Sequence, residues 1–248
     1  MPNHWHRALI SRFFHRASTT TKVHLADLVC RSFEEITYDR LAHMGFKPKA
    51  IIDVGAFRGD WTRLAQRQFG PVPSLMAEAQ GDLAPYLKQV VQDLPDVRLA
   101  NCLLGSEGGQ KRSFFEMGTG SSMMPERSDV VRKERMLVTR TLDDVVGDCL
   151  PDAKDIFLKI DVQGAELEVL RGGRKTLGKC SLVQLEVALL QYNEGAPLMP
   201  ETVAFMAERN FLPIEISGFS RPRDRLVQID MLFAPVGSPL RPGRFIFD

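Results

Sequence analysis

The stretch from residue 155 to residue 173 constrains the fold of this chain more than any other part of its sequence. It reads Asp-Ile-Phe-Leu-Lys-Ile-Asp-Val-Gln-Gly-Ala-Glu-Leu-Glu-Val-Leu-Arg-Gly-Gly. The apolar run at 156–160 predicts a strand that is buried on both faces, and the apolar spacing that follows, ended by Gly172, predicts a short helix. Asp161 is therefore expected at the carboxyl end of a strand, where the ligands of open α/β sheets bind.

Charged residues within this stretch leave alternatives open. Asp161 either caps the helix, which would begin near Gln163, or takes part in ligand binding. Lys159 lies among aliphatic residues, so it must snorkel, pair with an acid or meet a ligand, because burying an isolated ammonium group is costly. Glu166 either complements the dipole at the helix start or belongs to the site.

Strands and helices alternate along the rest of the chain. Strands are predicted at 50–54, 74–79, 97–104, 111–117, 181–187, 211–217 and 227–234, and helices at 25–44, 60–69, 82–94, from 141 onward, and at 199–209. Thr141, with Asp144 three residues later, is a capping pattern that marks one helix start. Together these elements predict an α/β fold with a doubly wound, mostly parallel, seven-stranded Rossmann-like sheet and an antiparallel C-terminal hairpin. We expect one domain at 25–248, with a core at about 50–235, after a basic extension at 1–24.

Composition argues against several classes of protein. The chain has 248 residues, of which 44% are hydrophobic, enough for a sizeable core. Its 32 Lys and Arg residues are balanced by 31 Asp and Glu residues, so we expect no nucleic-acid partner. The four cysteines form no Cys-x-x-Cys pair, which favours reduced thiols in a cytoplasmic protein over a zinc or redox site. No apolar run is long enough for a transmembrane segment.

The N-terminal extension is basic and partly apolar. Residues 1–26 contain no acid, and their four Lys or Arg residues alternate with apolar ones: Arg7, Arg12, Arg16 and Lys22 among Trp5, Leu9, Ile10, Phe13 and Phe14. The pattern suits an amphipathic segment that contacts a membrane or a partner, or a transit peptide. It also suits an extension that packs on its own domain or on a neighbouring subunit, and of these alternatives we favour the last.

A strand, a glycine turn and a helix form the first half of a nucleotide site. Asp53, Gly55 and Gly59 follow the pattern Asp-x-Gly-x-x-x-Gly, in which glycines let the backbone approach a ligand and the helix start offers free amides. Glu78, at the end of the next strand, either accepts hydrogen bonds from two ribose hydroxyls or caps the following helix. Phe57 stands where a dinucleotide site requires glycine, and the chain has no Tyr-x-x-x-Lys pair, which disfavours a nicotinamide dehydrogenase. The pattern instead resembles the first two motifs of class I methyltransferases.

Residues 158–173 resemble the signature of the FkbM family of methyltransferases. The resemblance covers about 50–233 and includes further motifs in order: Asp53-Val-Gly-Ala56 with Gly59, Gly118-Thr-Gly-Ser-Ser122, Thr141-Leu-Asp143, Leu185-Glu186-Val187 and Asp230-Met-Leu-Phe233. It implies an S-adenosylmethionine-dependent O-methyltransferase that acts on a hydroxyl of a sugar, glycolipid or polyketide-type small molecule. The chain departs from the family where Phe57 replaces a frequent Asn and where Ala77-Glu78-Ala79 replaces Phe-Glu-Pro.

The resemblance and the strand ends together imply a set of site residues. For the cofactor these are Asp53, Gly55, Ala56, Phe57, Gly59, Glu78, Ala79, Leu103, Leu104, Ser122 and Asp161. For methyl transfer we predict Asp161 as the principal polar group, with Lys159 as its partner and Glu186 at the end of the adjacent strand. All five histidines precede the first strand, so the core has no histidine base of its own. Asp161 and Glu186 could also hold Mg²⁺, which binds oxygen ligands.

Some alternatives remain open at the level of sequence. The loop at 118–124 is either an active-site lid or a connection without chemistry. The rival functions are a non-catalytic module that binds S-adenosylmethionine or a nucleotide, and an NAD(P)-dependent oxidoreductase. The sequence identifies neither the methyl acceptor nor the oligomeric state.

Overall fold

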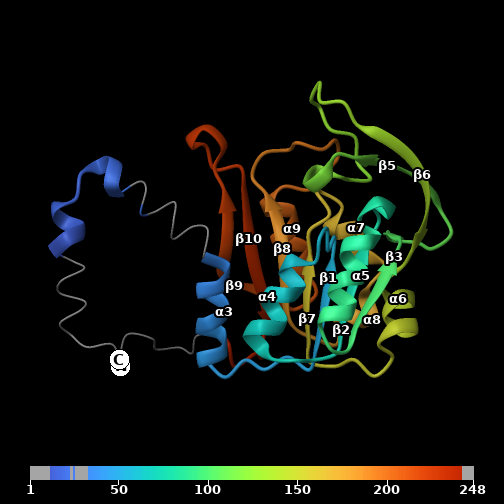
Figure 1. The fold of residues 1–248 in the computed structure, drawn as a ribbon, viewed down its shortest axis with the longest axis horizontal. Coiled ribbons are helices and arrows are strands. Elements are labelled where there is room, and N and C mark those ends of the chain that lie inside the picture. Colours follow the sequence, from blue (N-terminus) through green and yellow to red (C-terminus); the bar gives the residue numbers. More distant parts are fainter. Residues whose placement is uncertain (1–11, 23–24, 26–32, 242–248) are drawn as a thin grey trace.

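A seven-stranded sheet with helices on both faces forms the centre of the structure (Figure 1). The structure is a computed structural model, and it describes residues 12–22, 25 and 33–241. The strand order is β3-β2-β1-β7-β8-β10-β9. These strands are β1 (Ala50–Val54), β2 (Ser74–Glu78), β3 (Val97–Asn101), β7 (Ile156–Ile160), β8 (Cys180–Ala188), β9 (Phe211–Ser220) and β10 (Gln228–Pro235).

The direction of the strands confirms the predicted doubly wound sheet. Strands β3, β2, β1, β7 and β8 are parallel, and β10 runs antiparallel to both β8 and β9. The chain builds outward from β1 to β3 and then crosses over to β7 on the other side of β1. A crevice forms at the carboxyl ends of the strands where the order reverses in this way, and it is the usual ligand site of such sheets.

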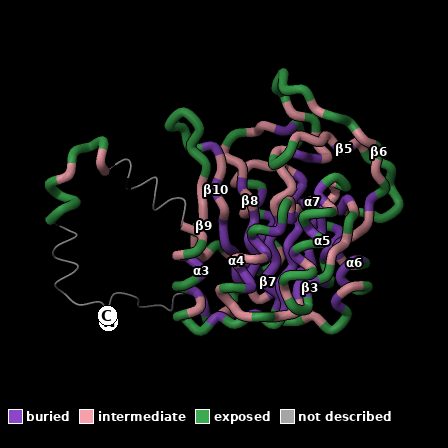
Figure 2. Tube along the Cα trace, viewed as in Figure 1, coloured by how far each residue is buried: buried purple, intermediate pink, exposed green. Residues whose placement is uncertain are grey.

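Two groups of helices cover the two faces. The helices are α3 (Phe33–His43), α4 (Asp60–Phe69), α5 (Ala84–Asp93), α6 (Leu142–Cys149), α7 (Glu166–Arg171), α8 (Arg174–Leu177) and α9 (Met199–Ala207). Helices α3, α4 and α5 cover the face that carries Ile51 and Phe157, and α6 to α9 cover the face that carries Ile52 and Leu158. Successive residues of a strand point to opposite faces, so the central strands are buried along their whole length (Figure 2).

A row of polar side chains interrupts the apolar face beneath α3 and α4. Asp53, Lys159 and Gln184 lie side by side across β1, β7 and β8. They share this face with Phe157, whose ring centroid lies 5.2 Å from that of Trp61. Polar groups in such an apolar setting need partners close by, and each of the three has them at the site described below.

A second, three-stranded sheet lies near the carboxyl edge of the first, and the sequence predicts only part of it. It consists of β4 (Leu103–Leu104), β6 (Lys133–Arg140) and β5 (Lys111–Glu116) in that order. The prediction of one strand at 97–104 is wrong, because the chain leaves the main sheet after Asn101 and Leu103 pairs with Thr139 of β6. The sequence does not predict strand β6, because four of its eight residues are charged and few are buried.

The helix boundaries follow the predicted signals in most places. The Thr141 hydroxyl accepts the N–H of Asp144 at 3.1 Å, which confirms the predicted cap of α6. Helix α3 ends at His43, just before Gly45 with its φ of 90°, and it packs against β9 at one edge of the sheet. Residues 26–32, the earlier part of the helix predicted at 25–44, lie outside the described residues.

The N-terminal extension is described from residue 12 to residue 22. Residues 12–16 and 19–22 are helical and lie apart from the domain (Figure 1). Phe13 and Phe14 are 61% and 45% exposed, so these two side chains do not pack on the domain, while packing of the extension on a neighbouring subunit stays a prediction. No helix within the described ranges is long and apolar enough to cross a bilayer. The division into 1–24 and 25–248 stays a prediction.

Candidate active site

A cleft opens at the carboxyl ends of β1, β2 and β7, where the order of the sheet reverses. Residues of the glycine turn, the strand ends, β4 and the loop at 118–123 line it. Eight of the predicted cofactor residues lie in its wall: Gly55, Ala56, Phe57, Glu78, Ala79, Leu103, Leu104 and Asp161. The other three, Asp53, Gly59 and Ser122, do not line the cleft, and they contact residues in or near its wall.

The glycine turn after β1 fits closely against the end of β7. Gly55 has a φ of 77°, and a Cβ at this position would overlap the carbonyl oxygen of Asp161, so only glycine fits. Gly59 has a φ of 78°, and a Cβ there would lie 2.8 Å from Val90 Cγ2. Gly59 therefore permits α4 to pack on α5, and it does not border the ligand cleft.

Phe57 is a strained residue in the cleft wall. Its φ of 48° lies in the left-handed region, which Asn and Gly adopt more readily than bulky side chains. The family that the sequence resembles often has Asn at this position, and the backbone geometry gives the reason. The Phe57 ring packs against the apolar cluster beneath α5, and the Arg58 guanidinium lies 5.4 Å from the ring centroid.

Glu78 lines the cleft wall and does not cap the following helix, because neither the short 3-10 helix at Gly81–Leu83 nor α5 has a side-chain cap; its ribose role stays a prediction. Its side chain is buried, with Oε2 accepting the N–H of Phe57 at 2.7 Å and Oε1 accepting the N–H of Gln80 at 2.8 Å. Oε1 also accepts a hydrogen bond from Gln80 Nε2 at 3.4 Å, whereas Oε2 keeps a second lone pair for a further donor. Glu78 thus ties the glycine turn to the end of β2 while it lines the cleft.

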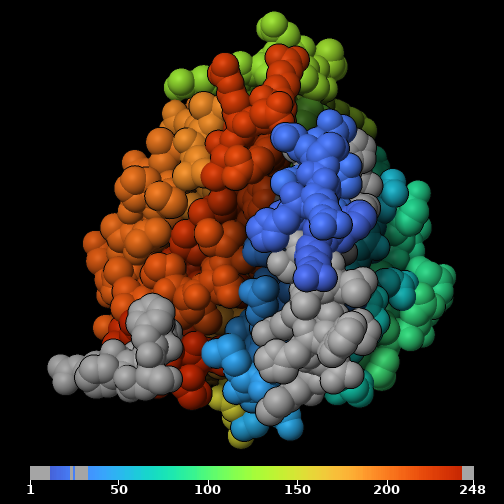
Figure 3. Space-filling view, turned by 90° about the vertical axis from the view of Figure 1, so that its left-hand side faces the viewer, coloured from blue at the N-terminus to red at the C-terminus, as the bar shows by residue number. Residues whose placement is uncertain are grey.

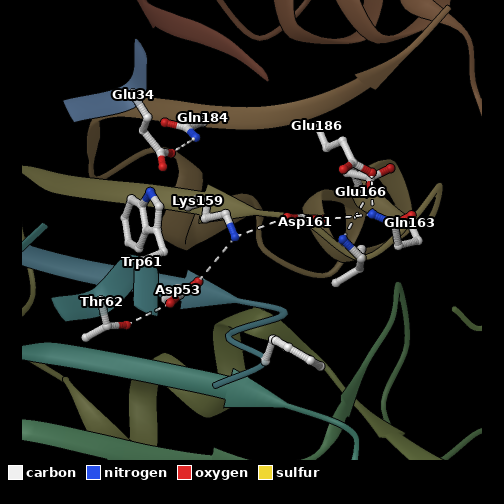
Figure 4. Close-up of polar contacts among 12 residues, drawn as sticks. Glu34, Asp53, Trp61, Thr62, Lys159, Asp161, Gln163, Glu166, Gln184 and Glu186 are labelled. Atoms are coloured by element: carbon white, nitrogen blue, oxygen red, sulfur yellow. Dashed lines mark hydrogen bonds and ion pairs between the residues drawn. The ribbon is translucent and has the colours of Figure 1, made fainter. Parts of the chain in front are cut away.

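Lys159 lies between two carboxylates at the inner end of the cleft (Figure 4). Its Nζ is 3.2 Å from Asp161 Oδ2 and 3.8 Å from Asp53 Oδ1, so the predicted pairing with an acid is confirmed. Burial alone would lower the pKa of Lys159, but the charges of Asp161 and Asp53 together raise it above its ordinary value. Burial raises the pKa of Asp53 despite the nearby Lys159 and a 2.7 Å hydrogen bond from Thr62. Lys159 therefore stays protonated and is no general base.

A chain of hydrogen bonds connects the cleft wall to α3. Trp61 lines the cleft, and its Nε1 donates to the Tyr38 hydroxyl at 2.6 Å. That hydroxyl lies within hydrogen-bonding distance of Gln184 and Glu34, and Gln184 Nε2 donates to Glu34 at 2.7 Å. Burial raises the pKa of Tyr38 well above its ordinary value, so its hydroxyl stays a donor. Lys159 Nζ lies 5.8 Å from the Trp61 ring centroid. The hydrogen bonds that hold the Trp61 indole therefore also hold the ring beside the lysine.

Gln163 bridges the two carboxylates predicted for methyl transfer (Figure 4). Its Nε2 donates to Asp161 Oδ1 at 3.0 Å and to Glu186 Oε2 at 2.6 Å. Its φ is 54°, and its carbonyl accepts hydrogen bonds from Ser122 Oγ at 2.8 Å and Asn193 Nδ2 at 2.5 Å. Both the backbone and the side chain of Gln163 are thus held in place, and Ser122 reaches the site through this residue.

The space between Asp161 and Glu186 does not fit the predicted Mg²⁺ site. The Gln163 amide, a donor to both carboxylates, lies where they would have to share a cation. A second amide, that of Gln228, donates to the other oxygen of Glu186. In the part of the chain that the structure describes, no group of three His, Cys, Asp or Glu side chains could hold a metal ion. A cation needs oxygen ligands on several sides, and here two are already hydrogen-bonded to amides.

Two further carboxyl groups near Asp161, those of Glu186 and Asp230, are half-buried, and the pKa of each is raised above its ordinary value. Glu186 and Asp230 face each other across β8 and β10. Burial raises the pKa of Asp230 to about 7, with a smaller contribution from the charge of Asp161. Burial likewise raises the pKa of Glu186 well above its ordinary value, helped by Asp161 and Glu166. This side of the site therefore contains groups that exchange protons nearer to neutral pH than ordinary carboxyls do.

Glu166 holds the turn between β7 and α7. Its Oε1 accepts the N–H groups of Val162 at 3.1 Å and Gly164 at 3.0 Å, and burial raises its pKa to about 7. Helix α7 begins at Glu166 without a side-chain cap. The alternative in which Asp161 caps a helix beginning near Gln163 does not hold, because Glu166 binds the amides of this turn. These contacts favour the structural alternative for Glu166.

The loop at 118–124 forms part of the cleft wall. Ser121 and Met123 line the cleft, together with Gly118 and Thr119. Ser121 Oγ accepts the N–H of Met117 at 2.8 Å, and Ser122 is fastened to Gln163 as described above. The loop therefore borders the site, which weighs against the alternative of a remote connection.

Sequence patterns do not single out three of the residues that organise this site. Gln163 lies between the strand-end Asp161 and the helix start, so its place in the 155–173 stretch was a usable signal. Trp61 is the second residue of α4, directly after the glycine turn. Asp230 is brought beside Glu186 only by the pairing of β10 with β8, which no local pattern reveals.

The sequence matches one protein family, and several solved methyltransferase structures are similar to this one. Residues 53–213 match the methyltransferase FkbM domain. Burkholderia thailandensis 1,6-didemethyltoxoflavin-N1-methyltransferase, with bound 1,6-didemethyltoxoflavin and S-adenosylhomocysteine, is 14% identical over 92% of this chain and 86% of that chain, with a TM-score of 0.45. Geobacter metallireducens precorrin-6y C5,15-methyltransferase is 11% identical over 81% and 84%, with a TM-score of 0.45. Magnesium protoporphyrin IX methyltransferase from Synechocystis PCC 6803, with bound S-adenosylmethionine, is 10% identical over 83% and 81%, with a TM-score of 0.44. No curated protein matches the sequence.

Proposed function

Because the chain belongs to the FkbM methyltransferase family and is thus an S-adenosylmethionine-dependent methyltransferase, we propose that it methylates a hydroxyl group. The acceptor would be a sugar, a glycolipid or a polyketide-type small molecule. The observation that carries this proposal is the setting of Asp161, which lines the cleft with its carboxylate held by Lys159 on one side and Gln163 on the other. An oriented carboxylate at this place suits an alcohol that must be positioned and must lose a proton.

The cofactor would occupy the part of the cleft between the glycine turn and β2. Glu78 would accept hydrogen bonds from the ribose hydroxyls, because two backbone amides already orient its carboxylate. Leu103 and Leu104 would offer an apolar wall to the adenine ring. Asp53 would act indirectly, by holding Lys159 from below the cleft. When bound, S-adenosylmethionine supplies an electrophilic methyl group on a sulfonium.

The chain's own residues would then position the acceptor and handle its proton. Methyl transfer is an in-line displacement, so holding the hydroxyl at near-attack distance accounts for much of the rate. Asp161 would orient the hydroxyl and accept its proton, while Lys159 keeps that carboxylate in place at 3.2 Å. Glu186 does not line the cleft and would act through Gln163, as a positioning residue. No step of this mechanism involves Mg²⁺.

The proposed partner is therefore a small-molecule alcohol, in the cytoplasm. The cysteines support this location, because the three in the described residues, Cys102, Cys149 and Cys180, are free thiols. The balance of 32 basic and 31 acidic residues gives no reason to propose a nucleic-acid substrate.

The test is a screen for S-adenosylhomocysteine formation with sugars, glycolipids and natural-product alcohols as acceptors. With an acceptor in hand, Asp161→Asn should retain cofactor binding and lose turnover by about a hundredfold or more, because it removes the proton acceptor. The matched control is Asp152→Asn, at an exposed turn, which should remain fully active. Full activity in Asp161→Asn would overturn the assigned role.

Two further observations would redirect the proposal. Turnover that requires added Mg²⁺ and stops with EDTA would show that the reaction uses a metal ion despite the Gln163 amide between Asp161 and Glu186. Cofactor binding without product from any acceptor would favour a non-catalytic module, and a change in nicotinamide absorbance with alcohols would favour an oxidoreductase.

A further inference from the structure

The described part of the N-terminal extension is an exposed basic and aromatic segment. Phe13 and Phe14 are 61% and 45% exposed on the helix at 12–16. Arg12 and Arg16 are also on this helix, and at 3.6 residues per turn they fall on a different side from the two rings. Lys22 lies near the Phe14 ring, with Nζ 5.7 Å from its centroid. Exposed aromatic residues beside cations are typical of helices that lie in the interface of a bilayer.

A second basic element is the hairpin at 221–225, between β9 and β10. Arg221, Arg223 and Arg225 are all exposed. Over the described ranges, none of the three has a carboxylate within ion-pair distance, whereas ten other arginines do. Asp224 is the one acid between them. The hairpin thus presents cations that the rest of the described chain leaves uncompensated.

The hairpin stands at the same edge of the sheet as the candidate active site. Asp230 faces Glu186 in the pairing of β10 with β8, and the pairing of β10 with β9 ends at Gln228 and Ser220. The hairpin therefore projects beyond the line of these carboxyl groups (Figure 1). Both the hairpin and the segment at 12–22 lie on the side of the molecule that Figure 3 shows. We refer to these two elements, 12–22 and 221–225, as the basic face.

We propose that the basic face docks the protein on a membrane surface rich in anionic lipid. It carries six Lys or Arg side chains against one carboxylate, while the whole chain has a formal net charge of only +1, so the positive charge is concentrated there. A cytoplasmic leaflet with anionic lipids attracts such clusters, and exposed phenylalanines add apolar insertion. A single-stranded nucleic acid would also attract arginines and stack its bases on exposed rings; we favour the bilayer because cations and rings lie on different sides of one helix, as in helices of the membrane interface.

The experiment is sedimentation of the full chain with vesicles, either phosphatidylcholine alone or equal amounts of phosphatidylcholine and phosphatidylglycerol. Binding is expected only to the anionic vesicles and should weaken as salt is raised. Replacing the three hairpin arginines, as Arg221→Ser, Arg223→Ser and Arg225→Ser together, should lower partitioning roughly a hundredfold. Replacing both rings, as Phe13→Ser and Phe14→Ser, should also weaken binding but leave its salt dependence intact.

A control variant shows whether a loss of vesicle binding comes from the hairpin itself or from the lower net charge of the protein. Lys88→Ser, Arg174→Ser and Lys175→Ser together remove the same charge from exposed positions on α5 and α8, and vesicle binding should hardly change. Unfolding midpoints of all variants show whether each is folded. Equal binding to neutral vesicles, unchanged binding of the hairpin variant, or an equal loss in the control would overturn the proposal. Tight binding to single-stranded RNA without binding to anionic vesicles would overturn it in favour of a nucleic-acid surface.

Discussion

The two halves of the cleft are built in different ways. The half that we propose for the cofactor, at β1 and β2, is called the cofactor half; it consists of close backbone approaches, and its Glu78 is oriented by amides of neighbouring turns. The half that we propose for methyl transfer, at β7, β8 and β10, is called the transfer half; it consists of buried and half-buried ionisable side chains that depend on one another, with Lys159 between Asp53 and Asp161. Close backbone packing determines the structure of the first half, and interactions between charged side chains determine that of the second. Substitutions in the first half should therefore act through steric overlap, and substitutions in the second half through the loss of a charge partner.

The largest expected effect is in the backbone of the cofactor half. Gly55→Ala should lower the free energy of unfolding by about 4 kcal/mol, since the added Cβ overlaps the Asp161 carbonyl and the residue must also keep a positive φ. Gly109→Ala is the matched control, because its φ is 78° but the space around it is open; it should cost about 1 kcal/mol. Urea denaturation measures both. Equal losses in the two variants would show that the close approach at Gly55 is unimportant.

The next largest loss of stability is expected in the transfer half, where a substitution removes a charge. Lys159→Met should lower the free energy of unfolding by about 3 kcal/mol, because it leaves the buried Asp53 without its cation. Adding Asp53→Asn should recover part of that loss, since a neutral amide needs no counter-ion. The double variant is compared with each single variant by urea denaturation. A Lys159→Met loss below about 1 kcal/mol, or no recovery in the double variant, would contradict the electrostatic account.

This contrast also explains how much the sequence could predict. Gly55, Glu78 and Asp161 follow from local patterns, because a glycine turn and an acid at a strand end are set by a few neighbouring residues. The pairing of Lys159 with an acid follows from the cost of burying a lone cation. Asp230 and Gln184 could not be placed, because they meet Glu186 and Lys159 only through the pairing of distant strands. Strand β6 could not be predicted because half of its residues are charged and few are buried, and the choice between the alternatives for Glu166 depends on the direction of its side chain, which is a tertiary property.

The transfer half should also make stability depend on pH. The pKa of Asp230 is raised from 3.8 to about 7, so the folded state binds more protons than the unfolded state between about pH 4 and pH 7. Stability from this group is thus fully present below about pH 4 and is lost as the pH rises toward 7. Asp230→Asn should raise the free energy of unfolding by about 2 kcal/mol at pH 8 and by nothing at pH 4. The exposed Asp152→Asn is the control, and a gain of equal size at both pH values would refute the titration of Asp230.

The division between the two halves is tested most directly by titrating the folded chain with S-adenosylmethionine, by calorimetry, in Glu78→Ala and Asp161→Asn. Glu78→Ala should weaken binding by about tenfold or more, because it removes the buried carboxylate that we propose as acceptor for the two ribose hydroxyls. Asp161→Asn should bind within about threefold of the unaltered chain, since the amide keeps the shape of the transfer half. Unchanged affinity in Glu78→Ala, or a loss in Asp161→Asn as large as that in Glu78→Ala, would contradict the account.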